Sequence, residues 1–180
     1  MKKKRFPVSK VISGGQTGVD RAALDAAMEV GVPHGGWCPK GRRAEDGRIP
    51  RKYRLKETKS SFYQDRTRKN VRDSDATLVF YCGRHPVGGS KLTVEYAEKI
   101  GRPCYLAHIM HDDIAAHVLG WMQNDGFIIC RSDRCMRIPE GPVLNVAGPR
   151  ESECPGIYRK VREIMEKILI MKVYPMSNNG

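Results

Sequence analysis

No apolar run in the 180-residue chain approaches the length of about 18 residues that a transmembrane helix requires, so no membrane-spanning segment is expected. The basic start, Met1-Lys2-Lys3-Lys4-Arg5, is not followed by the apolar segment of a secretory signal. The six cysteines (38, 82, 104, 130, 135 and 154) are scattered without a Cys-x-x-Cys spacing. They indicate free thiols rather than a disulfide framework or a structural zinc site. The sequence therefore predicts a soluble cytoplasmic protein.

The usual signatures of catalysis are also missing. There is no Gly-x-Ser-x-Gly elbow, and no Ser or Cys is paired with His at a diagnostic spacing. The chain has neither a P-loop nor the Gly-x-Gly-x-x-Gly dinucleotide fingerprint. The thiols of Cys38 and Cys154 could ligate a soft metal, but bystander thiols are the simpler interpretation, and no metal site is predicted. A non-catalytic binding protein is favoured over an enzyme.

Positive charge is plentiful but local. The net charge is +12, and residues 1–10 contribute five basic side chains and no acid. Residues 40–72 hold thirteen Lys and Arg against four acids, which more than accounts for the remaining +7. A local basic surface suits a partner that carries phosphate. Nucleic acid is one such partner, but aromatics make up only 7% of the chain and no known nucleic-acid module is recognisable.

Strand-like and helix-like segments alternate along the chain, which predicts an α/β fold with a mostly parallel sheet of about five to seven strands. Strands are expected at about 8–13, near the glycines at 34–36, at 53–58, 76–81, 103–107 and 143–147, and helices at about 18–30, 61–73, 91–100, 114–124 and from 157 onward. Residues 127–142 are expected to form an edge strand or an insertion. We expect a basic tail (1–9), one domain (10–172) and a frayed carboxyl terminus (173–180), with no second domain.

The most informative stretch is the glycine-rich segment that joins the first strand to the first helix. In Ser13-Gly14-Gly15-Gln16-Thr17-Gly18, paired glycines let the backbone approach a ligand without a Cβ in the way. The free amides and the dipole of the following helix favour an anion there. The alternative is a plain strand-to-helix turn in which Thr17 or Asp20 caps the helix.

Three further strand-to-helix loops, at 34–47, 82–91 and 148–156, belong to the same edge of a parallel sheet, where ligands bind at the switch point. The second glycine-rich turn, Gly88-Gly89-Ser90, could hold another anionic group. Lys40, Arg42, Arg43 and Arg150 could bind phosphate, although a solvated loop explains Arg42 and Arg43 equally well. Glu45 or Asp46 could accept hydrogen bonds from the amino-pyrimidinone edge of a pterin or guanine, or merely neutralise those arginines. Trp37 could stack on a ligand or cover the core.

Together these loops resemble the family of putative molybdenum carrier proteins, a branch of the SLOG superfamily. The resemblance rests on Ile12–Ala23 (ISGGQTGVDRAA), Gly35–Gly47 (GGWCPKGRRAEDG), Asn70–Asp75 (NVRDSD) and Leu144–Ser152 (LNVAGPRES), and it spans about residues 10–170. It implies a Rossmann-like three-layer α/β/α fold, a homodimer or homotetramer, and a surface pocket for molybdenum cofactor (molybdopterin). That cofactor is a phosphorylated pterin whose dithiolene binds a molybdenum oxyanion. The implied carrier holds the cofactor without chemistry and delivers it to molybdoenzymes.

Within that resemblance we assign the ligand-binding residues from the four loops. They are Gly14, Gly15, Gln16, Thr17, Asp20, Trp37, Cys38, Lys40, Gly41, Arg42, Glu45, Gly88, Gly89, Ser90, Thr93, Gly148, Arg150 and Glu151. Some relatives carry the older label of lysine decarboxylase, but the chain shows no pyridoxal-phosphate site.

Two alternatives stay open. The cytokinin-activating phosphoribohydrolases, another SLOG branch, use Pro-Gly-Gly-x-Gly-Thr-x-x-Glu, whereas this chain has Val87-Gly88-Gly89-Ser90-Lys91-Leu92-Thr93-Val94-Glu95. The glycine pair and the final Glu95 are kept, but the leading proline and the Gly-Thr pair are lost. A hydrolase of nucleoside monophosphates would use Glu95 to polarise water or to bind ribose. A nucleotide- or nucleic-acid-binding module would instead depend on the basic segments 1–10 and 40–72.

Overall fold

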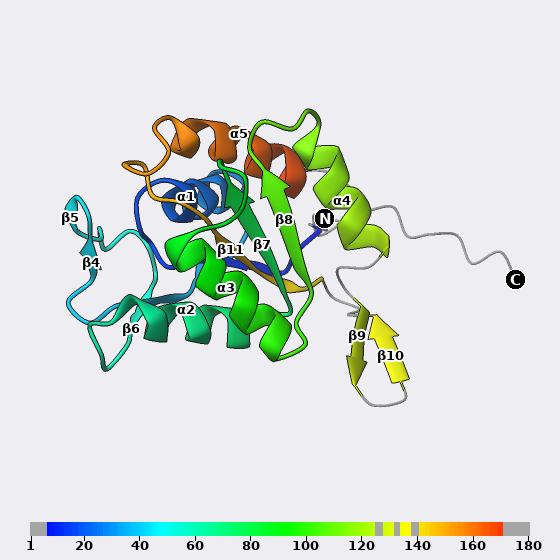
Figure 1. The fold of residues 1–180 in the computed structure, drawn as a ribbon, viewed down its shortest axis with the longest axis horizontal. Helices are drawn as coiled ribbons and strands as arrows, with labels where there is room; N and C mark the ends of the chain where they lie inside the picture. The colour runs from blue at the N-terminus through cyan, green and yellow to red at the C-terminus, as the bar shows by residue number, and fades with distance from the viewer. Residues whose placement is uncertain (1–6, 125–127, 132–133, 138–140, 171–180) are drawn as a thin grey trace, which may run out of the picture.

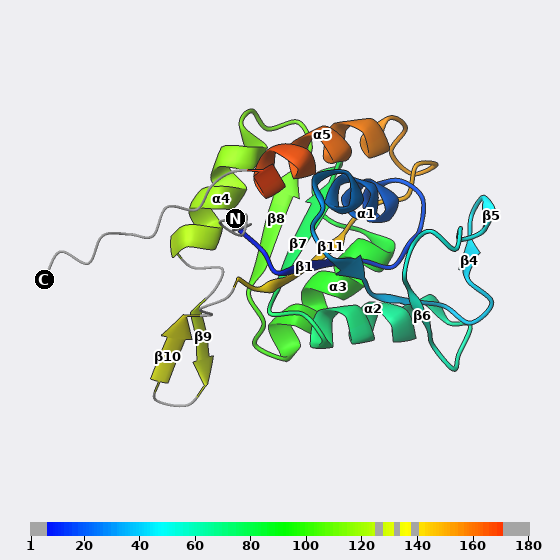
Figure 2. The same ribbon diagram turned by 180° about the vertical axis from the view of Figure 1, so that it is seen from behind.

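The computed structural model describes residues 7–124, 128–131, 134–137 and 141–170. Its centre is a sheet of five parallel strands in the order β2-β1-β11-β7-β8. The strands are β1 (Lys10–Ile12), β2 (His34–Gly35), β7 (Ala76–Tyr81), β8 (Cys104–His108) and β11 (Val143–Ala147). Helices α1 (Val19–Val30), α4 (Ile114–Asn124) and α5 (Ile157–Ile170) cover one face, and α2 (Tyr63–Arg72) and α3 (Gly88–Lys99) cover the other (Figures 1 and 2). The predicted three-layer α/β/α fold is therefore confirmed.

The strand order shows where a ligand would bind. Counted from β11 instead of β1, the order becomes 3-2-1-4-5, which is the order of a Rossmann sheet. The chain is thus a Rossmann-like fold in which the first strand and helix of that order, β11 and α5, stand at the end of the sequence. The direction of the chain reverses between β11 and β7, so the crevice beyond the carboxyl ends of these two strands is the switch point.

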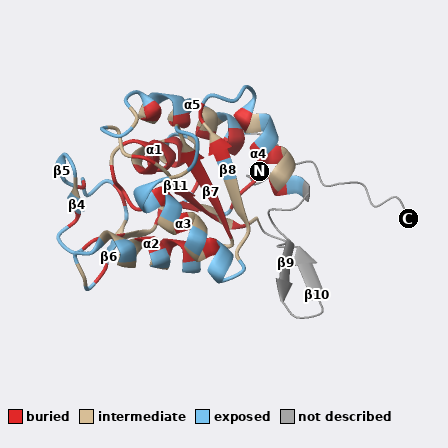
Figure 3. Cartoon of the chain, in the orientation of Figure 1, coloured by how far each residue is buried: buried red, intermediate tan, exposed pale blue. Residues whose placement is uncertain are grey.

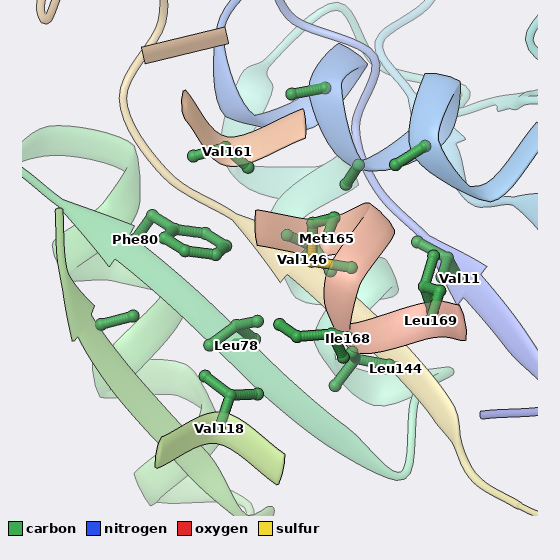
Figure 4. Close-up of a cluster of buried hydrophobic side chains, with 14 of the residues drawn as sticks. Val11, Leu78, Phe80, Val118, Leu144, Val146, Val161, Met165, Ile168 and Leu169 are labelled. Carbon is green, nitrogen blue, oxygen red and sulfur yellow. The ribbon is translucent and has the colours of Figure 1, made fainter. Parts of the chain in front are cut away.

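Most of the apolar core lies between the sheet and the α1–α4–α5 layer. Alternate residues of β7 and β11 (Leu78 and Phe80, Leu144 and Val146) point toward that layer and are fully buried (Figures 3 and 4). On α5 the apolar residues predicted to form one stripe pack against them, because their spacing of three and four places them on one helical face. The intervening residues of the strands, Thr77 and Asn145, are also buried but face the α2–α3 layer.

The helix boundaries agree with expectation except at α3. Gly31 ends α1 in the left-handed conformation (φ 81°), as glycine does at a helix C-cap. Helix α3 begins at Gly88, three residues before the predicted start at Lys91. The glycine pair, which we expected to form a loop, is therefore the first turn of the helix. Its open amides belong to the helix amino terminus itself.

Four short strands and a hairpin lie outside the main sheet. Of the predicted strand at 53–58 only β6 (Lys56–Glu57) forms, and it pairs in parallel with β3 (Trp37–Cys38). Strands β4 (Arg43–Ala44) and β5 (Gly47–Arg48) make a small hairpin. Within the segment 127–142, β9 (Ile128–Arg131) and β10 (Arg134–Arg137) form an antiparallel hairpin that does not join the main sheet, as expected of an insertion.

The expectations for both chain ends fall largely outside the described residues. These are the basic tail, of which residues 1–6 are not described, and the frayed end at 173–180. Among the helices that are described, none combines the length and apolar character needed to cross a membrane.

A buried carboxylate ties the α1–α5 layer to the segment that precedes β6. Asp25 on α1 accepts hydrogen bonds from Lys52 Nζ (2.9 Å), Tyr53 Oη (2.8 Å) and Tyr158 Oη (2.9 Å). Burial opposes its ionisation, but the three donors outweigh burial and lower the pKa of Asp25 below its ordinary value. The three contacts therefore stabilise the charged form of Asp25 more than the neutral form.

A pH dependence of stability follows. A carboxyl group whose pKa is lowered by folding stabilises the protein above its unfolded pKa of about 3.9, and this stabilisation is lost as the pH falls through the lowered folded value. Asp25→Asn should thus cost stability at neutral pH, and its difference from the unsubstituted protein should narrow in acid. Urea unfolding of both proteins from about pH 6 to about pH 3 tests this. A difference that stays constant over the whole range would contradict it.

Candidate functional site

A shallow pocket, open to solvent, lies at the switch point on the α2–α3 side of the sheet. Four segments line it: the loop after β1, the inner face of α2, the first turns of α3, and the end of β11 with its loop. Three of the four strand-to-helix loops predicted to form the site therefore contribute to it. The fourth, 34–47, does not line it, and α2 takes its place.

A buried ion pair forms the wall between α1 and α2. Arg66 Nη1 lies 2.6 Å from Asp20 Oδ2, and the two side chains are 16% and 4% exposed. The amide of Gln16 donates to the same carboxylate oxygen at 3.2 Å. A Cβ on Gly14 would lie 1.2 Å from Arg66 Nη1 and 2.7 Å from Asp20 Oδ2. Gly14 is therefore a glycine because the guanidinium lies directly over its backbone.

Two buried donors in this wall have no partner among the described residues: Gln16 Nε2 and Arg66 Nε. Gln16 is only 6% exposed, and its Oε1 already accepts hydrogen bonds from the amides of Thr17 (3.0 Å) and Glu45 (2.9 Å). These two bonds fix the orientation of the Gln16 side chain and leave its amide nitrogen without an acceptor among the described residues. Since a buried donor without an acceptor costs about 1–3 kcal/mol, two of them in one pocket indicate that an acceptor belongs there.

The start of α3 offers further donors to the same pocket. Gly89, Ser90 and Thr93 line it, but the amide of Ser90 already donates to the carbonyl of Val87 (3.1 Å) and the hydroxyl of Thr93 to that of Gly89 (2.8 Å). The amides left for a ligand are therefore those of Gly88 and Gly89, which have no intrahelical partner. A Cβ at Gly88 or Gly89 would meet no atom within 4 Å. The space above this turn is therefore open, and a ligand can approach the backbone closely. The helix dipole favours negative charge at this position.

The β11 segment supplies the remaining wall. Asn145 is 2% exposed and donates to Thr77 Oγ1 (3.4 Å) across the two central strands. The loop beyond it carries Arg150 and Glu153, whose Nε and Oε1 atoms are 3.2 Å apart. At Gly148 a Cβ would lie 2.9 Å from the carbonyl oxygen of Phe80, so β11 and β7 come too close there for a side chain. This side of the pocket thus supplies the side-chain oxygens of Asn145 and Glu153 together with the guanidinium of Arg150.

Eight of the eighteen assigned residues line the pocket: Gly14, Gln16, Asp20, Gly89, Ser90, Thr93, Gly148 and Arg150. Gly88 is adjacent to it at the start of α3. The remaining nine assigned residues do not line the pocket; they lie in the neighbouring loops and in β3. The assignment of each of these residues to a ligand stays a prediction.

Glu45 joins the β4–β5 hairpin to the loops behind the pocket. Its carboxylate accepts hydrogen bonds from the hydroxyls of Thr17 and Ser152 and from the Ser152 amide (3.3 Å). Desolvation opposes ionisation of the carboxyl group, but the hydrogen bonds outweigh it and lower the pKa of Glu45 below its ordinary value. Thr17 Oγ1 in turn accepts from the amide of Glu151 at 3.2 Å. Because both Glu45 oxygens are engaged, this residue holds the loops that carry Thr17 and Ser152 together.

Glu151 has a comparable role at α5. Its carboxylate accepts hydrogen bonds from the amides of Gly156 (2.5 Å) and Tyr158 (3.0 Å), at the start of the helix. A carboxylate at this position stabilises the helix through its dipole. The residue therefore fixes the loop that carries Arg150 and Glu153.

Arg42 and Cys38 are buried away from the pocket. Arg42 is 7% exposed, and its guanidinium donates to the carbonyls of Ile49, Pro50, Tyr53 and Leu55, at 3.0–3.1 Å. Four of its five N–H groups are thereby used within the loop. Cys38 is fully buried in a small core, where desolvation raises the pKa of its thiol. These contacts favour structural roles for both.

Trp37, Lys40 and Gly41 lie beyond the pocket, on the outer side of the same segment. Trp37 Nε1 donates to Asp73 Oδ2 at 2.7 Å, and the amide of Gly41 donates to Glu57 Oε2 at 2.7 Å. Lys40 is exposed. None of the three is among the residues that line the pocket.

Sequence reasoning missed the contribution of α2, which lines the pocket with Arg66, Thr67 and Asn70. We expected one face of the 61–73 helix to be solvated, and its other face buries the polar residues Thr67 and Asn70. The spacing of these three residues places them on one helical face, which was the available signal. Asn145, a polar residue within a buried strand, was a second signal.

Glu95, the candidate catalytic residue of a hydrolase, is not among the lining residues. Its side chain is 57% exposed, and it pairs with Lys91 at 3.6 Å on the surface of α3. Over the described part of the chain, no group of three or more His, Cys, Asp or Glu side chains is arranged to hold a metal ion.

Comparisons with known proteins agree with this fold. The family model of the circularly permutated YpsA SLOG family matches residues 11–169. Among solved structures, the chain is similar to the crystal structure of a putative molybdenum carrier protein from Syntrophus aciditrophicus SB. The two sequences are 40% identical, the match covers 92% of this chain and 97% of that chain, and the TM-score is 0.79. No curated protein matches the chain.

Proposed function

Because the chain belongs to the circularly permutated YpsA SLOG family, we propose that it is a binding protein whose switch-point pocket holds a small oxyanion-bearing ligand of the molybdenum cofactor class. The similar structure from Syntrophus aciditrophicus is described as a putative molybdenum carrier protein, which supports this ligand class. The cofactor carries both a phosphate and a molybdenum oxyanion, and it is the cargo here rather than a catalyst.

The observation that carries the proposal is the pair of unpartnered donors, Gln16 Nε2 and Arg66 Nε, in the pocket wall. An oxyanion would satisfy both donors, and the amides at the start of α3 would add to them. Hydrogen bonds to a charged group contribute roughly 1.5–3 kcal/mol each. A few of them, after the cost of association, would give roughly micromolar affinity or tighter.

The opposite wall would recognise the part of the ligand that donates hydrogen bonds. Asn145 and Glu153 line that side, and their oxygens can accept from the N–H groups of a pterin edge. We assign this role to them in addition to the earlier candidate, Glu45. The oxygens of Glu45 and Glu153 also have partners within the protein, and those of Glu153 are bonded to the side chain and the amide of Arg150.

Binding without turnover fits the residues of the pocket. Its two carboxylates, Asp20 and Glu153, are each paired with an arginine, and Glu95 lies outside it. No observation on the described residues favours hydrolysis of a nucleotide as a second function. The homodimer or homotetramer and the molybdoenzyme acceptors that the resemblance implies remain predictions.

The test is native mass spectrometry of protein purified from a host that makes molybdenum cofactor and from one that cannot. We expect a bound mass that matches the pterin, only in the first host. Gly89→Asp should abolish it, because the new carboxylate would repel an anion at the start of α3. The same carboxylate is favoured by the helix dipole, so thermal stability should be kept.

Gly120→Asp, in the middle of α4 and outside the pocket, is the matched control and should retain the bound mass. Protein that is bare from both hosts, or that carries a nucleotide from both, would overturn the proposed ligand. A Gly89→Asp protein that still retains the cofactor would overturn the proposed place of binding.

A further inference from the structure

The pocket does not account for the excess of Lys and Arg in residues 40–72. We call the exposed surface of this segment, formed by the β3–β6 pair, the β4–β5 hairpin and the outer side of α2, the basic face. These elements lie at one end of the molecule, away from β9 and β10, in both views (Figures 1 and 2). Of the thirteen Lys and Arg in this segment, Arg42 is buried, and Lys52, Arg66 and Arg72 are ion-paired. The other nine have no ion pair with any described residue.

Three of the four acids of the same segment have other partners. Glu45 accepts from Thr17 and Ser152, Asp46 binds Arg21, and Glu57 accepts from a backbone amide. These three carboxylates are used in contacts elsewhere, and none of the nine cations forms an ion pair with a described residue. The excess of positive charge is thus a property of the folded surface as well as of the sequence.

At two places the fold brings like charges together. Arg43 and Arg48 are directly opposite each other in the β4–β5 hairpin, where a pair of equal charges is destabilising. Lys69 Nζ and Lys56 Nζ lie 3.9 Å and 5.7 Å from the centroid of the Trp37 ring. Two ammonium groups therefore converge on one indole. A chain of phosphates would relieve the repulsion between Arg43 and Arg48 and would pair with the two ammonium groups.

Aromatic rings accompany these charges. Phe62, next to the amino terminus of α2, is 74% exposed, and the ring of Tyr63 follows it. An exposed phenylalanine among unpaired cations suits a partner that has both phosphates and flat rings. Single-stranded nucleic acid has this combination, and proteins bind it through basic grooves and aromatic stacking.

We propose that the basic face binds single-stranded nucleic acid, with Arg43, Arg48, Lys56 and Lys69 contacting phosphates and Phe62 stacking on a base. The face is separate from the lining of the pocket, so this inference does not depend on the proposed carrier function.

The test is the fluorescence anisotropy of a labelled 12-nucleotide oligouridylate, titrated with the full chain at several salt concentrations. For single strands the slope of log K against log salt is about −0.7 for each phosphate contact. Replacing both Lys56 and Lys69 with Gln should therefore flatten the slope by about 1.4 and weaken binding. Phe62→Ala should weaken binding by about fivefold or more and leave the slope unchanged, because stacking is not ionic.

The matched control replaces Arg159 and Lys167 of α5, both exposed and on the other side of the sheet, with Gln. It should bind like the unsubstituted protein. Every variant keeps residues 1–10, so the basic tail contributes equally to all of them. A Lys56/Lys69 variant with an unchanged slope, or a control that loses as much affinity, would overturn the proposal. So would competition by polyglutamate at equal charge, or an unaffected Phe62→Ala variant, because either would indicate a general polyanion surface.

Discussion

Gly18→Ala is expected to lower the free energy of unfolding by roughly 3 kcal/mol and to abolish ligand binding. Gly18 has φ 70° and ψ −127°, a backbone conformation that side chains disfavour. A Cβ there would lie 2.6 Å from the carbonyl oxygen of Pro149 and 2.7 Å from the amide nitrogen of Glu151. Since these are backbone atoms, the loop after β11 would have to move, and with it Arg150 and Glu153.

The matched control is Gly31→Ala at the end of α1. Gly31 also has a positive φ (81°), but a Cβ on it would meet no atom within 4 Å. Gly31→Ala should lower the free energy of unfolding by only about 1 kcal/mol, because only the positive φ disfavours alanine there. Urea unfolding of the two variants gives the comparison. Equal losses would show that the approach of the two loops at Gly18 does not matter, and would contradict the expectation.

The fold was accessible from the sequence because its main signals are local. The buried run 76–81 and the stripe of α5 predict their elements from periodicity alone, and Gly31 ends α1 as its position suggests. The strand at 53–58 was largely wrong for the opposite reason. The segment before β6 is held by tertiary contacts, in which Arg42 binds carbonyls of residues 49–55. No local pattern encodes those contacts.

The site was only partly accessible. Glycines that precede a helix mark a place where a ligand could approach, and Gly14, Gly89 and Gly148 all line the pocket. The sequence could not show that Arg66, 46 residues beyond Asp20, completes the same wall. Nor could it show that Glu45 would be bonded to Thr17 and Ser152. Such pairings depend on how the loops meet in three dimensions, which spacing along the chain does not record.

Arg66→Met should cost about 3–5 kcal/mol of stability and remove oxyanion binding. The substitution keeps most of the length of the side chain but removes the charge that pairs with the buried carboxylate of Asp20, at 2.6 Å. An uncompensated charge in a wall that is 4% exposed is strongly destabilising. Arg68→Met is the control on the same helix. Arg68 is exposed and has no ion pair with a described residue, so its loss should cost less than about 0.5 kcal/mol.

A double variant separates the two roles of Arg66. Asp20→Asn combined with Arg66→Met leaves no unpaired charge, and Asn can still accept from the Gln16 amide, so most of the lost stability should return. Binding should not return, because Arg66 Nε, one of the two free donors, is still missing. If the double variant is as unstable as Arg66→Met, the stability lost in Arg66→Met does not come from the unpaired charge of Asp20. A stable double variant that binds the oxyanion would mean that the unpartnered nitrogen is not the donor, and the proposed site would then have to rest on Gln16 and α3.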